Sequence, residues 1–294
     1  MNVSQSKKRI ALAVLALGAS GVVPAAAWAT GITGVSISGP YVLWSDIGGV
    51  LYPTVKAPGG PVGQAEIDAL AGSRSAPGGN VELNKFGGGY LQGAGFTTLS
   101  GDDGSGHSVT LRSLQQGDWG SSSAPTPLTL SYINGAAQSI GMTLDQNGLD
   151  EAVRRFFIAS IPCPAALEGC APWQLVSDPN ISYVDIFPTK VHVGLAGFLN
   201  AGPILQAMFP NSPVPVPAEA QVSEVVGVTF AGVSEFLFGF SGTNSGVYAA
   251  GDTGRPFELR SYSGNYDVAI PEPESLALLG LGLVGLFLGR RRQS

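Results

Sequence analysis

The stretches TLRSL at residues 110–114 and LTLSYI at residues 128–133 alternate apolar and polar side chains. Successive side chains of a strand point to opposite faces, so this alternation predicts strands with one buried face. Similar segments recur along the chain, separated by clusters of Gly, Asp, Asn, Ser or Pro. These further predicted strands are 34–38, 41–44, 81–86, 181–187, 224–230, 235–240 and 257–262.

The composition supports the same fold class. The chain has 294 residues with 42 glycines and 21 prolines, so breaks in regular structure recur every few positions. Frequent breaks favour many short strands over long helices. We therefore expect a mainly β protein whose central domain, residues 30–270, is an antiparallel β-sandwich of the jelly-roll or Ig-like kind.

One segment predicts a helix. In LDEAVRRFFIAS, residues 149–160, apolar side chains recur at helical spacing. Asp150 and Glu151 stand in the first turn, where carboxylates suit the helix dipole, and Pro162 follows the end. We expect this one short helix to pack on the sandwich.

The charge distribution argues against a nucleic-acid partner. The whole chain has a net charge of −6, but six of its 15 basic residues lie in the runs 7–9 and 290–292. Residues 30–270 keep nine basic and 19 acidic side chains, a net charge of −10. Phosphate contacts need clusters of basic residues, which this acidic domain lacks.

The first 29 residues have the pattern of a secretory signal peptide. Basic residues 7–9 precede an uncharged, mostly apolar run at 10–23, and Ala27 and Ala29 supply the small residues that signal peptidase reads. We expect cleavage after Ala29, with an uncleaved anchor helix as the alternative.

Residues 275–289 form a second uncharged apolar run, followed by Arg290, Arg291 and Arg292. At about 1.5 Å per residue this run predicts a transmembrane helix of roughly 22 Å, which can insert if the bilayer thins locally. The positive-inside rule would keep the arginines cytoplasmic and the domain outside.

The tripeptide Pro271, Glu272 and Pro273 precedes this helix. Together, the tripeptide, the Leu/Gly-rich helix and the arginine cluster resemble the PEP-CTERM sorting signal, over residues 271–294. The two prolines keep the segment extended and deny it helix hydrogen bonds, which suits recognition by a processing enzyme.

The resemblance implies a route for the protein. It implies a Gram-negative source, a transient inner-membrane anchor, and recognition by exosortase at Pro271, Glu272 and Pro273, with Arg290–Arg292 as the stop signal. It further implies delivery to the cell surface or the biofilm matrix, where exopolysaccharide is a possible partner. The alternative is a permanent membrane anchor that is never cut.

Cys163 and Cys170 are the chain's two cysteines. An exported protein enters an oxidising space, so a disulfide that closes this short loop is the leading interpretation. A metal site or a nucleophilic thiol is less favoured, because each needs partners such as the chain's two histidines, His107 and His192.

Two loops are rich in oxygen ligands and are weak candidates for binding calcium as a cofactor. Asp102 and Asp103 precede Gly-Ser-Gly, and Asp145 and Asn147 lie in DQNG. Calcium takes six to eight oxygen ligands, often from loops, but neither stretch matches an EF-hand. Ordinary Asx turns explain both stretches better.

The sequence offers little for catalysis. Neither histidine lies beside a recognisable nucleophile motif, and no G-x-S-x-G occurs. Adjacent carboxylates point apart, so the pairs Asp102–Asp103 and Asp150–Glu151 make poor glycosidase pairs.

Three tryptophans lie in the central domain, and Trp119, in GDWGSSS, is expected in a surface loop where its ring could meet a sugar. Core packing is expected for Trp44 and Trp173. We therefore expect a non-enzymatic surface or matrix protein of structural, adhesive or carbohydrate-binding character. The alternative is a hydrolase of exopolysaccharide, which would show a groove with two carboxyl groups about 5–9.5 Å apart.

Overall fold

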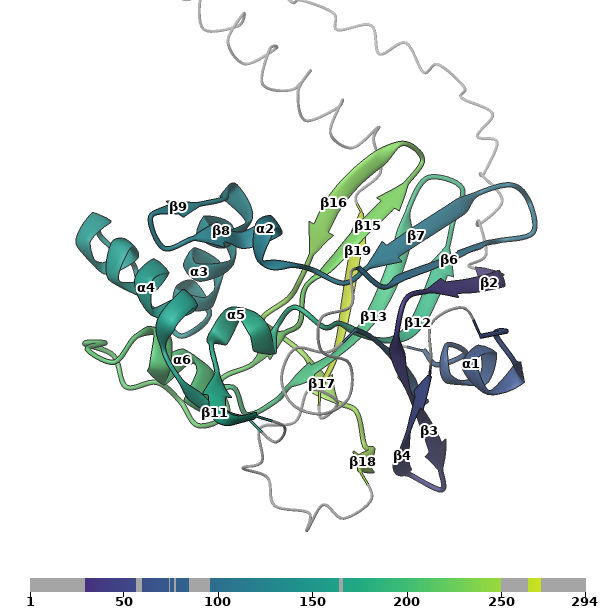
Figure 1. Cartoon of the computed structure of the whole chain (residues 1–294), viewed down its shortest axis with the longest axis horizontal. Coiled ribbons are helices and arrows are strands. Elements are labelled where there is room, and N and C mark those ends of the chain that lie inside the picture. The colour runs from purple at the N-terminus through teal and green to yellow at the C-terminus, as the bar shows by residue number, and fades with distance from the viewer. Residues whose placement is uncertain are drawn as a thin grey trace, which may run out of the picture.

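The computed structural model describes residues 30–56, 60–73, 75–76, 78–84, 96–163, 166–249 and 264–270. The predicted signal peptide (1–29), the predicted strand 257–262 and the sorting tail (271–294) lie outside these residues. The described part is built mainly from strands, with all but the first of its short helices gathered at one side (Figure 1).

The larger sheet has ten strands. Its main path runs β17-β19-β13-β12-β5-β3-β4-β18, and β1 and β14 pair with β12 and β13. Only residues 245–247 connect β17 to β18, so the two ends of the path lie near each other and the sheet curls into a half-barrel. Its strands are β1 (Thr30–Gly31), β3 (Tyr41–Ile47), β4 (Val50–Lys56), β5 (Asn80–Leu83), β12 (Asn180–Ile186), β13 (Val191–Phe198), β14 (Val222–Ser223), β17 (Thr243–Asn244), β18 (Tyr248–Ala249) and β19 (Gly264–Ile270).

The smaller sheet has five strands in the order β16-β15-β7-β6-β2, all antiparallel. The strands are β2 (Thr33–Ser38), β6 (Thr98–Asp102), β7 (Ser108–Arg112), β15 (Val226–Phe230) and β16 (Val233–Leu237). Two small hairpins, β8 (Gly120–Ser121) with β9 (Ala124–Pro125) and β10 (Ile161–Cys163) with β11 (Ala166–Cys170), stand apart from both sheets.

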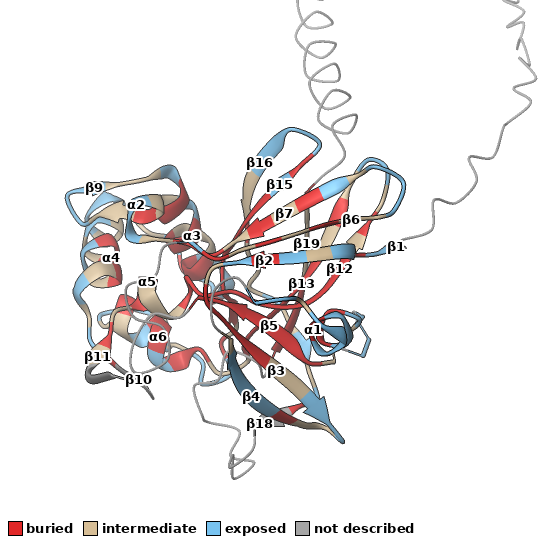
Figure 2. Cartoon of the chain, turned by 45° about the vertical axis from the view of Figure 1, so that its right-hand side comes forward, coloured by how far each residue is buried: buried red, intermediate tan, exposed pale blue. Residues whose placement is uncertain are grey.

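The two sheets enclose one core. The larger sheet contributes side chains such as Leu43, Val81 and Val193, and the smaller sheet contributes Leu111 and Val228. All five of these side chains are buried, and Figure 2 shows buried residues along strands of both sheets. The prediction of a mainly β protein with antiparallel sheets is therefore confirmed.

The prediction of a single helix is wrong. The described residues contain α1 (Gln64–Ala69), α2 (Gln116–Trp119), α3 (Pro127–Ser139), α4 (Gln146–Ile158), α5 (Pro172–Leu175) and α6 (Gly202–Met208). Of these, α4 coincides with the predicted helix. Helices α2 to α6 form a lobe beside the two sheets (Figure 1).

The prediction of a strand at residues 128–133 is wrong. They lie in α3, which Thr126 caps by accepting the Thr129 N–H at 3.4 Å, with Pro127 at the first helical position. The alternation of Leu128, Leu130 and Tyr132 is too short to distinguish a strand from a helix.

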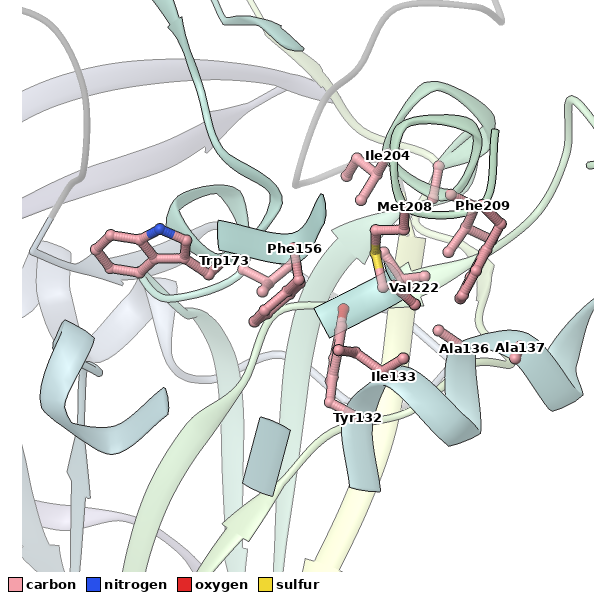
Figure 3. Packing of buried hydrophobic residues seen from close by; sticks show 14 of the residues in the cluster. Tyr132, Ile133, Ala136, Ala137, Phe156, Trp173, Ile204, Met208, Phe209 and Val222 are labelled. Atoms are coloured by element: carbon pink, nitrogen blue, oxygen red, sulfur yellow. The ribbon is translucent and has the colours of Figure 1, made fainter. Parts of the chain in front are cut away.

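The lobe has its own hydrophobic core. Tyr132, Ile133 and Ala136 of α3 face Phe156 of α4 and Met208 of α6 (Figure 3). This second core accounts for helices that the strand pattern did not predict. None of the helices in the described ranges is long and apolar enough to span a bilayer.

Candidate ligand-binding groove

An open groove of about 530 Å³ lies where the lobe meets the edge of the smaller sheet. Helix α3 and the loop before it form one wall, and the edge strand β16 and the residues after it form the other. Its lining residues are Asp118, Thr126, Pro127, Leu128, Ser131, Glu235, Phe236 and Phe238.

Two phenylalanines give the groove an aromatic wall. Phe236 and Phe238 are two residues apart on an extended segment, so they share a face, and both are half-buried. The Phe238 ring packs edge-on against Tyr132 with centroids 5.1 Å apart, and Tyr132 packs edge-on against Trp119 at 5.6 Å. Because Tyr132 and Trp119 are fully buried, they hold Phe238 in place.

Asp118 forms the polar end of the groove and is fixed by Arg112. Arg112 donates through Nη1 to Oδ2 at 2.9 Å and through Nη2 to Oδ1 at 2.7 Å, and the Gln115 N–H also donates to Oδ2 at 2.9 Å. The guanidinium lies over the rings of Phe236 at 5.2 Å and Phe96 at 4.7 Å. Arg112 therefore links the acidic and aromatic parts of the groove.

Hydroxyl groups complete the helical wall. Thr126 donates to the Asp118 carbonyl oxygen at 2.7 Å, and Ser131 is exposed one turn further along α3. Glu235 lies directly opposite Val228 in the register, whereas Phe236 lies opposite Gly227, so Glu235 and Phe236 occupy opposite faces of β16. The groove thus combines aromatic rings with a few polar groups at its margin.

A second polar cluster lies on the face of the larger sheet that points away from the core. His192 Nδ1 is 3.1 Å from Asp267 Oδ1, and the Tyr183 hydroxyl donates to the same oxygen at 3.1 Å. Asp185 lies directly opposite His192 in the register. Burial, together with the charge of Asp267, raises the pKa of Asp185, while His192 acts in the opposite direction.

Three carboxyl groups are buried between the larger sheet and the lobe. Glu82, Asp178 and Glu224 are each at most 5% exposed. Asn180 donates to Glu224 Oε2 through its backbone N–H at 2.7 Å and through Nδ2 at 3.0 Å. Burial, followed by the charges of Asp178 and Glu82, raises the pKa of Glu224 well above its usual value. Such enclosure keeps Glu224 away from any solvent-borne ligand.

The first calcium candidates act as turn-forming residues. Asp102 Oδ1 accepts the Gly104 N–H at 2.7 Å, and Asp103 Oδ1 accepts the Ser105 N–H at 2.8 Å. Asp103 Oδ2 lies 2.6 Å from His107 Nδ1, and this bond lowers the pKa of Asp103 to about 2. These are the contacts of an Asx-type turn between β6 and β7.

The second pair of calcium candidates lies far along the chain, at the start of α4. Asp145 is the N-cap residue, with Oδ1 accepting the Gly148 N–H at 2.8 Å, and Asn147 is exposed in the first turn. Within the described ranges, no three His, Cys, Asp or Glu residues are grouped so that they could hold a metal ion.

The predicted carboxylate pair on α4 has helix-surface partners. Gln146 donates to Asp150 at 2.7 Å, and Glu151 accepts from Arg154 and Arg155 at 2.6 and 2.8 Å. The hydrogen bonds from Arg154 and then Arg155 lower the pKa of Glu151 to about 2.

The burial of the three tryptophans differs from the prediction. Trp119 is fully buried and donates to Ser177 Oγ at 2.8 Å, so the expectation of an exposed sugar-binding ring is wrong. Helix α2 turns the indole into the lobe core, and its neighbour Asp118 lines the groove instead. Trp173 is buried as expected, and half-buried Trp44 donates to Glu82 at 2.8 Å.

The two cysteines lie on neighbouring strands of the β10–β11 hairpin. Cys170 is opposite Ile161, Cys163 is opposite Ala166, and Cys170 is buried. The side chain of Cys163 is not among those that the structure describes, so their disulfide stays a prediction.

Comparison with known families concerns the tail. The family model of the PEP-CTERM protein-sorting motif matches residues 269–292, which include Pro271, Glu272 and Pro273. The chain carries a PEP-CTERM sorting motif. This confirms the resemblance drawn from the tripeptide, the apolar run and the arginine cluster.

The PEP-CTERM motif supports a surface protein that is exported, held as a membrane-anchored intermediate and processed by exosortase. The predicted signal-peptide residues Ala27 and Ala29 and the arginines 290–292 lie outside the described residues. No curated protein and no solved structure shows a significant match to the chain.

Sequence reasoning missed the groove because its walls come from distant segments. Residues 118–131 and 235–238 are brought together only when α3 packs on the extension of β16. A usable signal was present in the spacing of Phe236, Phe238 and Phe240 within a predicted strand, since three aromatic residues on one face need a partner surface.

Proposed function

We propose that this exosortase-sorted surface protein is a non-enzymatic, carbohydrate-binding module of the cell surface or matrix, and that the groove between α3 and β16 is its binding site. The observation that carries the proposal is the pairing of the half-buried rings of Phe236 and Phe238 with polar groups at the groove margin.

The chemistry of sugars fits this arrangement. A pyranose ring has an apolar face that can pack on an aromatic ring, and hydroxyl groups around its edge that need hydrogen-bond partners. Ser131 offers an exposed hydroxyl, and Asp118 offers carboxylate oxygens held in place by Arg112. The volume of about 530 Å³ lies within the range of small-ligand sites.

The experiment compares two phenylalanine variants of the full chain in lipid nanodiscs. Phe236→Ala removes a ring from the groove. Phe187→Ala removes a half-buried ring that contacts His192 and Lys190 on the other sheet. Binding of oligosaccharides prepared from the producing cells' exopolysaccharide is measured by calorimetry.

We expect Phe236→Ala to weaken binding about tenfold, because an aromatic contact contributes about 0.5–1.5 kcal/mol beyond its buried area. Phe187→Ala should bind as the unmodified chain does. Equal affinity of all three proteins, or no binding by any of them, would reject the groove as a carbohydrate site.

The same samples decide between binding and hydrolysis. We expect the oligosaccharides to be recovered at unchanged length, because Arg112 and the Gln115 N–H already engage the carboxylate of Asp118, one of the two carboxyl groups that line the groove. New reducing ends that appear with the unmodified chain and disappear in Asp118→Asn would instead establish a hydrolase.

A further inference from the structure

A second hollow, separate from the groove, lies within the helical lobe. It has a volume of about 350 Å³ and is enclosed by the loop before α4, the first turns of α4, the end of α6 and the loop that follows. Its lining residues are Met142, Thr143, Leu144, Asp145, Gly148, Glu151, Ala152, Met208, Phe209, Pro210, Asn211, Ser212 and Pro213.

The inner wall of this cavity is apolar and adaptable. Met142, Ala152, Met208 and Phe209 are all buried members of the lobe core. Methionine side chains are unbranched and polarisable, so they adjust to ligands of irregular shape. The wall therefore suits a short aliphatic chain, and the volume falls in the range of small-molecule sites.

The margin of the cavity is acidic. Asp145 and Glu151 are its ionisable lining residues, and no Lys, Arg or His is among the described residues that line it. Both oxygens of Glu151 are engaged by Arg154 and Arg155. Asp145 uses Oδ1 to cap α4, while its Oδ2 makes no hydrogen bond within the described part of the chain.

The helix dipole and the Asp145 carboxylate have opposite effects on a charged ligand: the dipole favours an anion, and the carboxylate favours a cation. The N-terminus of α4 corresponds to roughly +0.5 of a charge, and the carboxylate to a full negative charge. The carboxylate outweighs the dipole, so the margin favours a cationic group over an anionic one.

We propose that the lobe cavity is a site for small aliphatic amines, with the chain against Met142 and Met208 and the ammonium group at Asp145. The ligand is thus cationic at one end and apolar over the rest. This site does not depend on carbohydrate binding in the groove, so either proposal can fail alone.

Three probes of equal chain length separate the effects of chain and charge. Hexylammonium, hexanol and hexanoate are titrated into the full chain, held in nanodiscs and labelled with ¹³C in the methionine methyl groups. The chain has three methionines, and the two beyond Met1 both line the cavity. Shifts of the Met142 and Met208 signals therefore report binding at this site.

We expect hexylammonium to bind about threefold more tightly than hexanol, as for a partly exposed ion pair, and hexanoate to bind least. Asp145→Asn should abolish the preference for the amine and leave hexanol binding unchanged, because asparagine also caps helices well. The matched control is Asp46→Asn, since Asp46 likewise accepts a backbone N–H three residues ahead, from Gly49 at 2.7 Å.

Two results would overturn the proposal. One is the absence of any shift of Met142 and Met208 with all three probes. The other is an amine preference that survives in Asp145→Asn or is lost equally in Asp46→Asn.

Discussion

Arg112 and Asp118 form a two-point ion pair that ties the smaller sheet to the helical lobe. Both hydrogen bonds are short, 2.9 and 2.7 Å, and the side chains are 29% and 13% exposed. Because Arg112 belongs to β7 and Asp118 to α2, the pair spans the join on which the groove depends.

We expect Asp118→Ala to lower the free energy of unfolding by about 1–3 kcal/mol, since it leaves a partly buried guanidinium and the Gln115 N–H without their acceptor. Arg112→Lys should lower it less, because lysine keeps the charge but not the two-point geometry. Urea denaturation measures both, and equal stability of Asp118→Ala and the unmodified chain would contradict the expectation.

Glu224 should make stability fall with rising pH. Its pKa is raised in the folded state, so its protonated form is favoured there. The resulting stability is present below the unfolded pKa of about 4.3 and is lost as the pH rises through the folded value. Denaturation at several pH values should show a shallower decline above pH 5 in Glu224→Gln. Parallel curves for the variant and the unmodified chain would show that Glu224 has no raised pKa.

Asp103, in the turn between β6 and β7, has a lowered pKa, so its effect on the pH dependence of stability is opposite to that of Glu224. His107→Ala should raise the pKa of Asp103 from about 2 towards its ordinary value, because the bond from His107 is the largest cause of the depression. The stabilising contribution of this carboxylate is present above its unfolded pKa and is lost as the pH falls through the folded one. Side-chain NMR of Asp103 measures the change, and an unaltered pKa would contradict it.

Gly135 of α3 has no room for a larger side chain. A Cβ atom there would overlap the ring of Phe240, whereas a Cβ atom at Gly117 of α2 would have no neighbouring atom within 4 Å. We expect Gly135→Ala to cost about 1 kcal/mol or more, because Phe240 is packed against Tyr132 and Phe238. Gly117→Ala should be neutral or slightly stabilising. Thermal unfolding of the two variants tests this, and the reverse order would show that Phe240 moves freely.

Intact mass of the protein tests the processing steps and the disulfide together. Protein recovered outside the cell should lack residues 1–29 and the tail from near Pro271, and should be about 2 Da lighter than its reduced form. Replacing Pro271, Glu272 and Pro273 by alanine should leave the protein in the membrane fraction at a larger mass. Free thiols at Cys163 and Cys170 in freshly collected protein would reject the disulfide, independently of the sorting result.

The strands and the sorting motif could be read from the sequence because their signals are local. A strand's alternation spans a few consecutive residues, as at 34–38 and 181–187, which correspond to β2 and β12. The spacing of Val153, Phe156 and Phe157 likewise predicted the helix α4. The sorting motif is contiguous, so its parts are recognised in order without reference to the folded domain.

Where the local pattern was ambiguous, only the tertiary structure decided which secondary structure a segment adopts and which side chains are buried. Residues 128–133 show the alternation of a strand but lie in helix α3. Packing against α4 and α6 buries the apolar side chains that repeat about every 3.6 residues on one face of this helix. Trp119 entered the lobe core, while Asp118 beside it reached the groove. The groove and the lobe cavity are each lined by segments that lie far apart in the sequence. These segments meet because of tertiary packing, which the pattern of a few consecutive residues does not predict.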